Sequence, residues 1–319
     1  MMKRGLLYLS DSRNARKVLT GTPLTRAVSR RFVAGESLDD LMEAARQASA
    51  EGLTVTGNYL GEAVESEADA RVAADTYIEM VRRIQAEELP ANCSLKFTQM
   101  GQDISEAFLA ENLGRLLEVA DDADIFLRFD MESSDYTQRT LDAFEHLWDD
   151  GWRQIGVVLQ AYLKRTAGDV RRMIELGARV RICKGAYAEP ASVAFQDMNR
   201  IRENFIECMQ WLMSEGNYPA IATHDEVIID AARDYAGKRG IAPERFEFQL
   251  LYGVRRDLQR ELLDEGYNVR VYVPFGEKWY PYLMRRLAER PENLMFMMGS
   301  VVKESPLGFL WPGRRGERS

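Results

Sequence analysis

Residues 124–163 read DIFLRFDMESSDYTQRTLDAFEHLWDDGWRQIGVVLQAYL, and this stretch decides the fold. It begins with an apolar, strand-forming run at 124–132. A helical pattern follows at 137–151, and a second apolar run occupies 154–163. A strand, a helix and another strand in this order predict a crossover between two parallel strands of one sheet.

The same unit recurs along most of the chain. Longer helical patterns lie between the apolar runs, for example at 68–88 and 193–216. Eight such units predict an α/β fold, a (βα)₈ barrel of the TIM type with extra N-terminal helices. The eight apolar runs occupy residues 53–61, 93–101, 124–132, 154–163, 179–187, 219–225, 246–253 and 268–276.

The principal alternative is an open, doubly wound sheet. Such a sheet normally carries a G-x-G-x-x-G motif after its first strand when it binds a dinucleotide. The sequence contains neither this motif nor a P-loop, which favours the barrel. We therefore predict an N-terminal helical arm at 1–50 and a catalytic barrel at 51–305. Residues 306–319 are expected to form a C-terminal cap and a disordered tail.

Composition narrows the class of protein. The chain has 319 residues, 46% of them hydrophobic, and a net charge of −8, which fits a globular protein better than a dedicated nucleic-acid binder. Its 3 cysteines favour a reducing compartment, and its 2 histidines argue against a metal site. No apolar run reaches the roughly 18 residues of a membrane span. We expect a cytoplasmic protein.

The predicted strand ends are unusually polar. Catalytic residues of a barrel gather at the C-terminal ends of its strands, and charged side chains inside a barrel require partners or a polar ligand. One such residue by itself is more often solvated or structural, and His224 alone is typical of a structural histidine. Their number and common position indicate a site. They are Lys96 and Thr98, expected on one face of strand two, Arg128 and Asp130, expected on one face of strand three, and Gln160, Arg181, Lys184, Tyr187, Thr223, His224, Asp225, Gln249 and Tyr272.

A helix predicted after the eighth strand carries a second polar group. Tyr282, Arg285, Arg286 and Glu289 follow the i, i+3, i+4, i+7 spacing that places them on one helix face. Such a face is ordinarily solvated. If it faces the barrel mouth, the two arginines form a clamp for a small carboxylate, and Glu289 orients them.

Five motifs now make a family recognisable. KGAY (184–187), Thr-His (223–224), FQLLYG (248–253), VYVPFG (271–276) and YxxRRxxE (282–289) appear in this order. The sequence thereby resembles the proline dehydrogenase family, which also occurs as a domain of the bifunctional proline utilisation flavoproteins. The chain is too short for a fused aldehyde dehydrogenase domain, so it resembles the monofunctional bacterial members.

The resemblance implies an FAD-dependent enzyme that oxidises L-proline to Δ1-pyrroline-5-carboxylate by hydride transfer to flavin N5. The implied catalytic residues are Lys96, Asp130, Tyr187, Tyr272, Arg285 and Arg286. The implied substrate contacts come from Lys96, Leu251, Tyr272, Tyr282, Arg285 and Arg286. The implied FAD contacts come from Gln160, Arg181, Lys184, Gly185, Ala186, Thr223, His224, Gln249, Arg286 and Glu289.

The resemblance also implies partners. Electrons would pass to a membrane quinone during transient peripheral contact, and a separate pyrroline-5-carboxylate dehydrogenase would consume the product. No nucleic acid is expected, and the oligomeric state stays open. Tyr272 suggests selectivity for proline over hydroxyproline, because a ring hydroxyl would crowd it. Asp225 departs from the asparagine common at this position. A carboxylate there would be tolerable near an FAD hydroxyl but would repel a cofactor phosphate.

Two other functions remain open at this stage. A Schiff-base aldolase barrel would use Lys96 or Lys184 as its nucleophile, with a pKa depressed by a dry pocket or a nearby cation. A binding protein without catalysis would use the arginine pair to hold an anionic ligand. A flavin spectrum that responds to proline distinguishes both from the favoured function.

Overall fold

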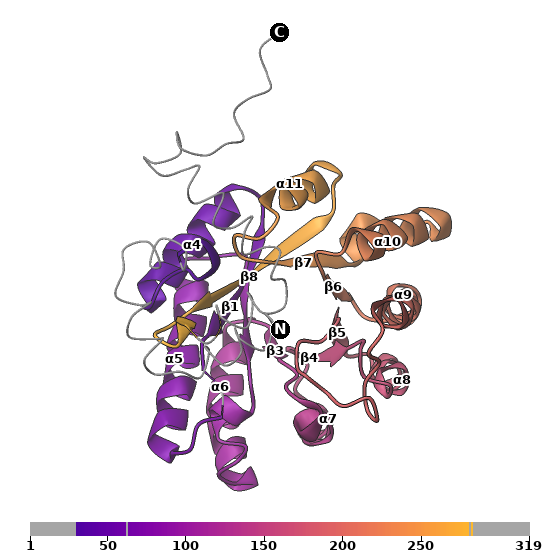
Figure 1. Cartoon of the computed structure of the whole chain (residues 1–319). Coiled ribbons are helices and arrows are strands. Elements are labelled where there is room, and N and C mark those ends of the chain that lie inside the picture. The colour runs from indigo at the N-terminus through magenta and orange to yellow at the C-terminus, as the bar shows by residue number, and fades with distance from the viewer. Residues whose placement is uncertain (1–29, 62, 281, 283–319) are drawn as a thin grey trace, which may run out of the picture.

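A computed structural model describes residues 30–61, 63–280 and 282. Its centre is a closed barrel of parallel strands in the order β1 to β8, with β8 paired to β1. Figure 1 shows the helices placed around this barrel. The predicted (βα)₈ fold is therefore confirmed. The strands are β1 (Thr54–Tyr59), β2 (Ala91–Leu95), β3 (Leu127–Phe129), β4 (Ile155–Gln160), β5 (Arg179–Cys183), β6 (Ala220–Ala222), β7 (Glu247–Leu251) and β8 (Asn268–Phe275).

Some helix ends carry clear local signals. Ser37 opens the helix that follows it with a capping box, in which its hydroxyl and the Asp40 carboxylate each accept a backbone N–H of the other residue. Gly177 ends another in the left-handed conformation. The α-helices are α4 (Leu38–Ala50), α5 (Glu67–Ala86), α6 (Glu106–Asp122), α7 (Ser134–Asp149), α8 (Thr166–Leu176), α9 (Met198–Glu215), α10 (Glu226–Arg239) and α11 (Arg256–Asp264), with 3₁₀ turns η1 (Thr98–Met100) and η2 (Pro243–Arg245).

The hydrophobic core lies between the strands and the surrounding helices. Gly57 of β1 approaches Leu41 of α4 and Met80 of α5 so closely that a Cβ would lie 2.9 and 2.7 Å from them. Phe129 of β3 and Phe144 of α7 are fully buried, with ring centroids 6.3 Å apart. α4 thus packs directly on the barrel, and it belongs to the segment at 1–50 that was predicted as an N-terminal helical arm.

The barrel interior is polar, unlike the usual interior of branched apolar side chains. Arg128 of β3 is only 2% exposed, and its guanidinium lies 4.8 Å from the ring centroid of Phe126. Gly156 of β4 leaves room for it, because a Cβ there would lie 3.2 Å from Arg128 Nη1 and 2.5 Å from the carbonyl oxygen of Arg179. Side chains that meet inside the barrel therefore interact mainly through charge and hydrogen bonds.

Strand two differs from its prediction. β2 ends at Leu95, and η1 begins at Thr98, so Lys96 and Thr98 do not share a strand face. The Thr98 hydroxyl, which lies in the 3₁₀ turn, donates to the Glu132 carboxylate at 2.8 Å. Asp130 also lies just beyond its strand, where its N–H donates to the carbonyl of Leu95 at 2.7 Å.

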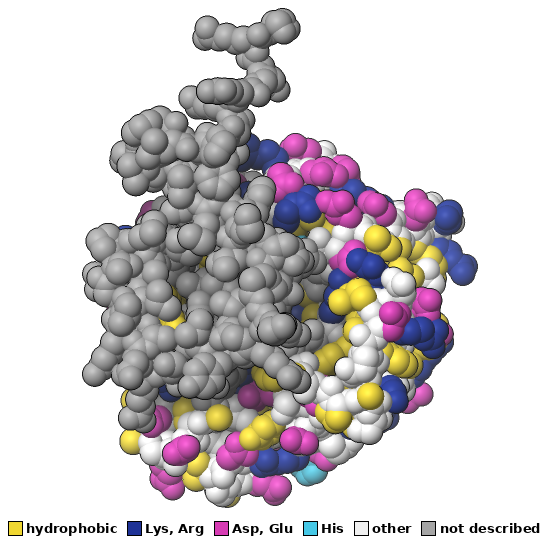
Figure 2. Space-filling view, in the orientation of Figure 1, with side chains coloured by type: hydrophobic (Ala, Val, Ile, Leu, Met, Phe, Trp, Pro, Cys, Tyr) yellow, Lys and Arg dark blue, Asp and Glu magenta, His cyan; other side chains and the backbone are white. Residues whose placement is uncertain are grey.

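The outer surface gives two further facts. Among the described residues, no helix is long and apolar enough to cross a membrane. On the face shown in Figure 2, acidic and basic side chains are interspersed over the outer helices. The described part of this face has no extended basic surface of the kind that nucleic-acid binders carry.

Candidate active site

Several strands contribute side chains to one carboxylate, that of Asp130, which is 12% exposed. Asp130 accepts hydrogen bonds from Tyr272 Oη at 2.7 Å, Ser94 Oγ at 2.6 Å and Arg181 Nη1 at 2.8 Å. Burial and the adjacent Asp130 charge raise the pKa of Tyr272 well above its usual value, so its phenol stays protonated and donates. β2, β5, β8 and the residue after β3 thus meet at the barrel mouth.

Arg181 supplies the cation of this cluster. Its Nη1 donates to Asp130 and, at 3.0 Å, to Ser94 Oγ, while its Nε donates to Gln249. The residue is 5% exposed, and its Nη2 finds no hydrogen-bond partner among the described residues. Burying a guanidinium nitrogen without an acceptor costs free energy, so Arg181 is suited to bind an acceptor atom of a ligand.

A series of hydrogen bonds continues from Arg181 down into the barrel. Gln249 donates its amide N–H to Glu247, and the Glu247 carboxylate also accepts from Arg270 Nε, 3.0 Å from each oxygen. We call Asp130, Arg181, Gln249, Glu247 and Arg270 the lumen column. Gln249, predicted as a cofactor contact, uses both ends of its amide within this column.

A second charged group, the rim cluster, consists of Lys184, Asp225 and Arg202. Lys184 Nζ and Arg202 Nε both bind the Asp225 carboxylate, the latter at 2.8 Å, and Asp225 also caps α10. Burial would raise the pKa of Asp225, but its bonds to Lys184 and Arg202 hold that pKa below the ordinary value. The negative charge expected to repel a phosphate is thus compensated by two cations.

The KGAY turn requires its glycine. Gly185 has φ +106°, and a Cβ would lie 2.3 Å from the ring of Tyr162. Ala186 is exposed beside it and Tyr187 is half-buried. Packing against Tyr162 therefore requires glycine at position 185, independently of the predicted contact with the cofactor.

The Thr-His motif connects strand ends. His224 Nε2 accepts the backbone N–H of Leu251 at 3.0 Å, and Thr223 Oγ1 accepts the N–H of Asp225 at 3.1 Å. These bonds tie the end of β6 to the end of β7 and to the start of α10. Both residues thus support the mouth, whatever they contact in a ligand.

Two further predicted site residues, Gln160 and Lys96, lie at strand ends and differ in their hydrogen bonding. Gln160 ends β4, where its amide donates to the carbonyl of Glu132 at 2.7 Å. Lys96 is half-buried just after β2, and its ammonium makes no hydrogen bond or ion pair with the residues that the structure describes. A lysine in this state is available to an anionic ligand.

Not every predicted residue can be placed, and some were missed. Tyr282 is buried; Arg285, Arg286 and Glu289 lie outside the described residues. Sequence reasoning missed three partners: Ser94, Arg202 and Glu247. Two of them carried a usable signal, because Glu247 precedes Gln249 by two residues and shares its strand face, and Ser94 becomes inward-facing once β2 is drawn from 91 to 95.

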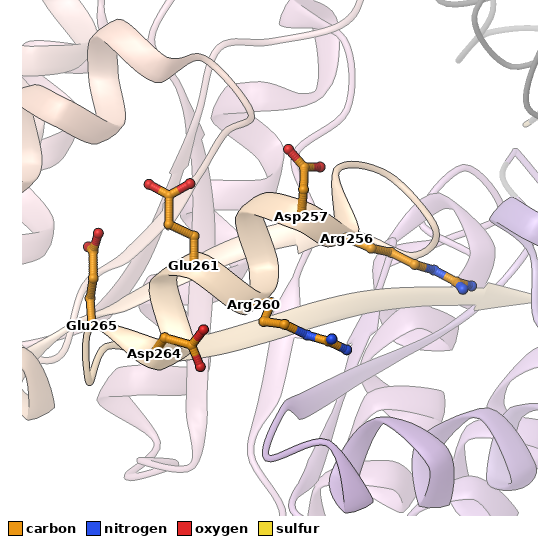
Figure 3. Close-up of a pocket in the computed structure, with 6 residues that line it drawn as sticks. All are labelled: Arg256, Asp257, Arg260, Glu261, Asp264 and Glu265. Atoms are coloured by element: carbon orange, nitrogen blue, oxygen red, sulfur yellow. The ribbon is translucent and has the colours of Figure 1, made fainter. Parts of the chain in front are cut away.

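Two outer pockets hold none of these residues. The larger, about 630 Å³, runs along α11 and is lined by Arg256, Asp257, Arg260, Glu261, Asp264 and Glu265. Figure 3 shows these charged side chains fanning out from both sides of α11. The smaller, about 480 Å³, lies at the opposite end of the barrel from the mouth, beside the start of β5. We place the site at the mouth, where buried polar groups converge and Arg181 Nη2 lacks a protein acceptor among the described residues.

Comparison with known proteins identifies the family. The family model described as proline dehydrogenase matches residues 41–298. The chain belongs to the proline dehydrogenase family. Proline dehydrogenase 1 of Bacillus subtilis (strain 168) is 36% identical over 304 residues, 95% of this chain and 100% of that protein. Proline dehydrogenase of Deinococcus radiodurans is 37% identical over 282 residues, 86% of this chain and 90% of that one.

A solved structure agrees with the family. Proline utilization A from Bdellovibrio bacteriovorus, inactivated by N-propargylglycine, aligns with a TM-score of 0.80 and 26% identity. The alignment covers 93% of this chain and 36% of that longer protein. The resemblance to proline dehydrogenases drawn from the five motifs is therefore confirmed, and the members of this family are flavoenzymes.

Proposed function

We propose that this protein oxidises L-proline to Δ1-pyrroline-5-carboxylate, with FAD bound at the barrel mouth. The observation that carries the proposal is the buried Arg181, held by Asp130 and Gln249 with its Nη2 lacking a protein partner among the described residues. Membership of the proline dehydrogenase family supports the substrate and the reaction.

The residues at the mouth fit a flavin. An isoalloxazine ring carries nitrogen and oxygen acceptors, and Arg181 Nη2 is a buried donor that needs one. Bound FAD would accept the hydride taken from the proline ring, and with it the two electrons of the oxidation. Arg181 would supply positive charge that stabilises the negative charge developing on the flavin during reduction. At the rim, Lys184 and Arg202 bring two cationic side chains to the single carboxylate of Asp225, which suits the rim to the negative parts of the cofactor.

The substrate carboxylate is bound by cations. Lys96 lies at the mouth without an ion pair in the described structure, and the family motif supplies Arg285 and Arg286. The Tyr272 hydroxyl is fixed on Asp130, which holds the phenol ring as a wall for the pyrrolidine ring. Leu251, Tyr187 and Tyr282 complete that wall in our proposal.

The reaction balances without a further reagent. Proline loses a hydride from its Cδ and a proton from its nitrogen, and a C=N bond forms between these two atoms. The proton leaves to solvent. The electrons then pass to a membrane quinone during transient contact, and the product is released to a separate pyrroline-5-carboxylate dehydrogenase. Tyr272 excludes a hydroxylated ring, so hydroxyproline is oxidised less efficiently; equal kcat/KM for both substrates would refute this selectivity.

The test is an anaerobic visible spectrum of the purified protein, recorded before and after addition of L-proline. Flavin bands that bleach with proline, and return with a soluble quinone, support the proposal. Flavin that stays oxidised refutes proline as substrate. Flavin that bleaches but does not return with quinone refutes the acceptor.

A matched pair of variants tests the carboxylate contact. Lys96→Met is expected to raise the proline concentration needed for half-maximal reduction by about 10–100-fold, because a charge-assisted hydrogen bond contributes about 1.5–3 kcal/mol. Lys164→Met is the control, because Lys164 binds only a backbone carbonyl at the surface; it should change this concentration less than about twofold.

The aldolase alternative loses support. A Schiff-base lysine must be neutral to attack, and Lys184 is paired with Asp225. Borohydride with a keto acid should therefore leave Lys96 and Lys184 unmodified; trapping at either lysine would restore the alternative.

A further inference from the structure

The amide of Gln249 can bind in one orientation only. On one side stands Glu247, an ionised carboxylate that only accepts hydrogen bonds, and on the other stands Arg181, a guanidinium that only donates. The Gln249 N–H group must therefore face Glu247 and its oxygen must face Arg181. Reversing the amide would set two donors against each other at Arg181 and two acceptors against each other at Glu247.

Glu247 is secured as an anion in the middle of the barrel. It is 2% exposed. Burial would raise its pKa, but Arg270, Arg128 and the hydrogen bond from Gln249 hold that pKa below the ordinary value. Arg270 contacts both carboxylate oxygens at 3.0 Å, and Tyr218 Oη lies 3.4 Å from one of them. The acceptor that orients Gln249 therefore keeps its charge and its place.

The orientation of Gln249 has a consequence at the mouth. Arg181 Nε is held by Gln249, and Nη1 is held by Asp130 and Ser94. A planar guanidinium fixed at two nitrogens has no freedom left at the third. Its remaining nitrogen, Nη2, is then presented at a defined point.

We propose that Glu247 is a positioning residue of the active site, which acts through Gln249 to fix the guanidinium of Arg181. This inference rests on the proposed function for its catalytic meaning, but the fixation of Arg181 is a property of the protein alone. Glu247 itself contacts neither substrate nor cofactor. Glu247 acts through the hydrogen bonds from Gln249 to Glu247 and from Arg181 to Gln249. The effect of Glu247 on Arg181 should therefore disappear when Gln249 is replaced by a residue without an amide.

The first experiment follows the Nε–H resonance of Arg181 in ¹⁵N-arginine-labelled protein, identified by its loss in Arg181→Lys. Glu247→Gln removes the charge that orients Gln249, and should speed solvent exchange of this N–H at least about tenfold. Gln249→Met should do the same while leaving the Glu247–Arg270 pair in place. Glu145→Gln, which removes a surface carboxylate paired with Arg172, is the control and should change the exchange rate less than twofold.

The second experiment measures the rate constant and the half-saturating concentration for flavin reduction by proline in the same variants. Glu247→Gln and Gln249→Met should each lower the rate constant about 10–100-fold, and the double variant should be no worse than either single one. Exchange or rates that stay at the wild-type level in both single variants overturn the inference. If Glu247→Gln alone has an effect, Glu247 acts through Arg270 and the inference also fails. If wild-type protein does not react with proline, the proposed function fails, while the exchange rates still decide whether Glu247 fixes Arg181.

Discussion

The two faces of the same strands have opposite chemistry. Phe129 of β3 faces outward and meets Phe144 of α7 edge to face. Its neighbour Arg128 faces the barrel interior as a buried cation, and Asp130 beyond it holds Arg181 and Tyr272. The outer layer buries apolar surface, whereas the interior buries charge.

This difference separates stability from chemistry. Apolar burial contributes stability without direction, so the outer layer tolerates changes that conserve volume. Buried ion pairs contribute little net stability, and removal of one partner destabilises the protein strongly, but such pairs hold groups in defined positions. We infer that the outer layer stabilises the barrel and that the lumen column arranges the site. Four predictions follow the comparison between these two regions.

The largest effect on stability is expected in the outer layer. Phe144→Ala removes a fully buried ring between α7 and β3, and should lower the free energy of unfolding by about 3–5 kcal/mol. Flavin reduction per folded molecule should stay within twofold of wild type at low temperature. Urea unfolding and single-turnover reduction measure the two quantities; a large loss of rate in the folded variant would break the separation.

The largest effect on chemistry is expected at Asp130. Asp130→Asn keeps the shape and one acceptor for Tyr272 but removes the charge that holds Arg181. The rate constant for flavin reduction should fall about 100-fold, which corresponds to about 2.7 kcal/mol. Stopped-flow reduction by proline measures it. A variant with wild-type rates would place the chemistry elsewhere at the mouth.

A third prediction concerns pH and the interior. The pKa of Glu247 is lower in the folded protein than the unfolded value of about 4.3. Its contribution to stability is therefore complete above that value and is lost as pH falls toward the folded pKa. Between pH 6 and pH 3, the free energy of unfolding measured in urea should fall less steeply for Glu247→Gln than for wild type. The two slopes should differ by at most about 1.4 kcal/mol per pH unit. Parallel curves would mean that Glu247 titrates alike in both states.

The smallest effect is expected for charge at the outer surface. Asp234 and Lys238 form an exposed i, i+4 pair near the end of α10, 3.6 Å apart. Asp234→Ala should lower the free energy of unfolding by no more than about 0.5 kcal/mol, because water screens such pairs. A loss comparable with that of Phe144→Ala would show that surface charge also carries stability here.

The fold was largely predictable because its signals are local. The helix expected at 137–151 is α7, Ser134–Asp149, and the run at 154–163 contains β4, Ile155–Gln160. The prediction for β2 was too long: the apolar run continues beyond Leu95, whereas the chain turns into η1, where Thr98 binds Glu132. That bond joins residues 34 positions apart, so no local pattern reports it.

The candidate site was predictable in its residue types and much less in its partners. Strand ends and family motifs pointed to Asp130, Arg181, Gln249 and Tyr272, and all four lie in one hydrogen-bonded group. Ser94 and Glu247 were missed. Their strand positions indicate that both face the barrel interior, but only their neighbours across the barrel show which residues they bind.

The sequence by itself determined the alternation of strands and helices, the barrel, and the family that its motifs indicate. The tertiary structure alone decided that Asp130 meets Ser94 and Arg181, which lie 36 and 51 positions away in the chain. Periodicity arises within one element and can be read along the chain. Contacts across a barrel depend on the register between strands, where a shift of one residue turns every side chain to the other face.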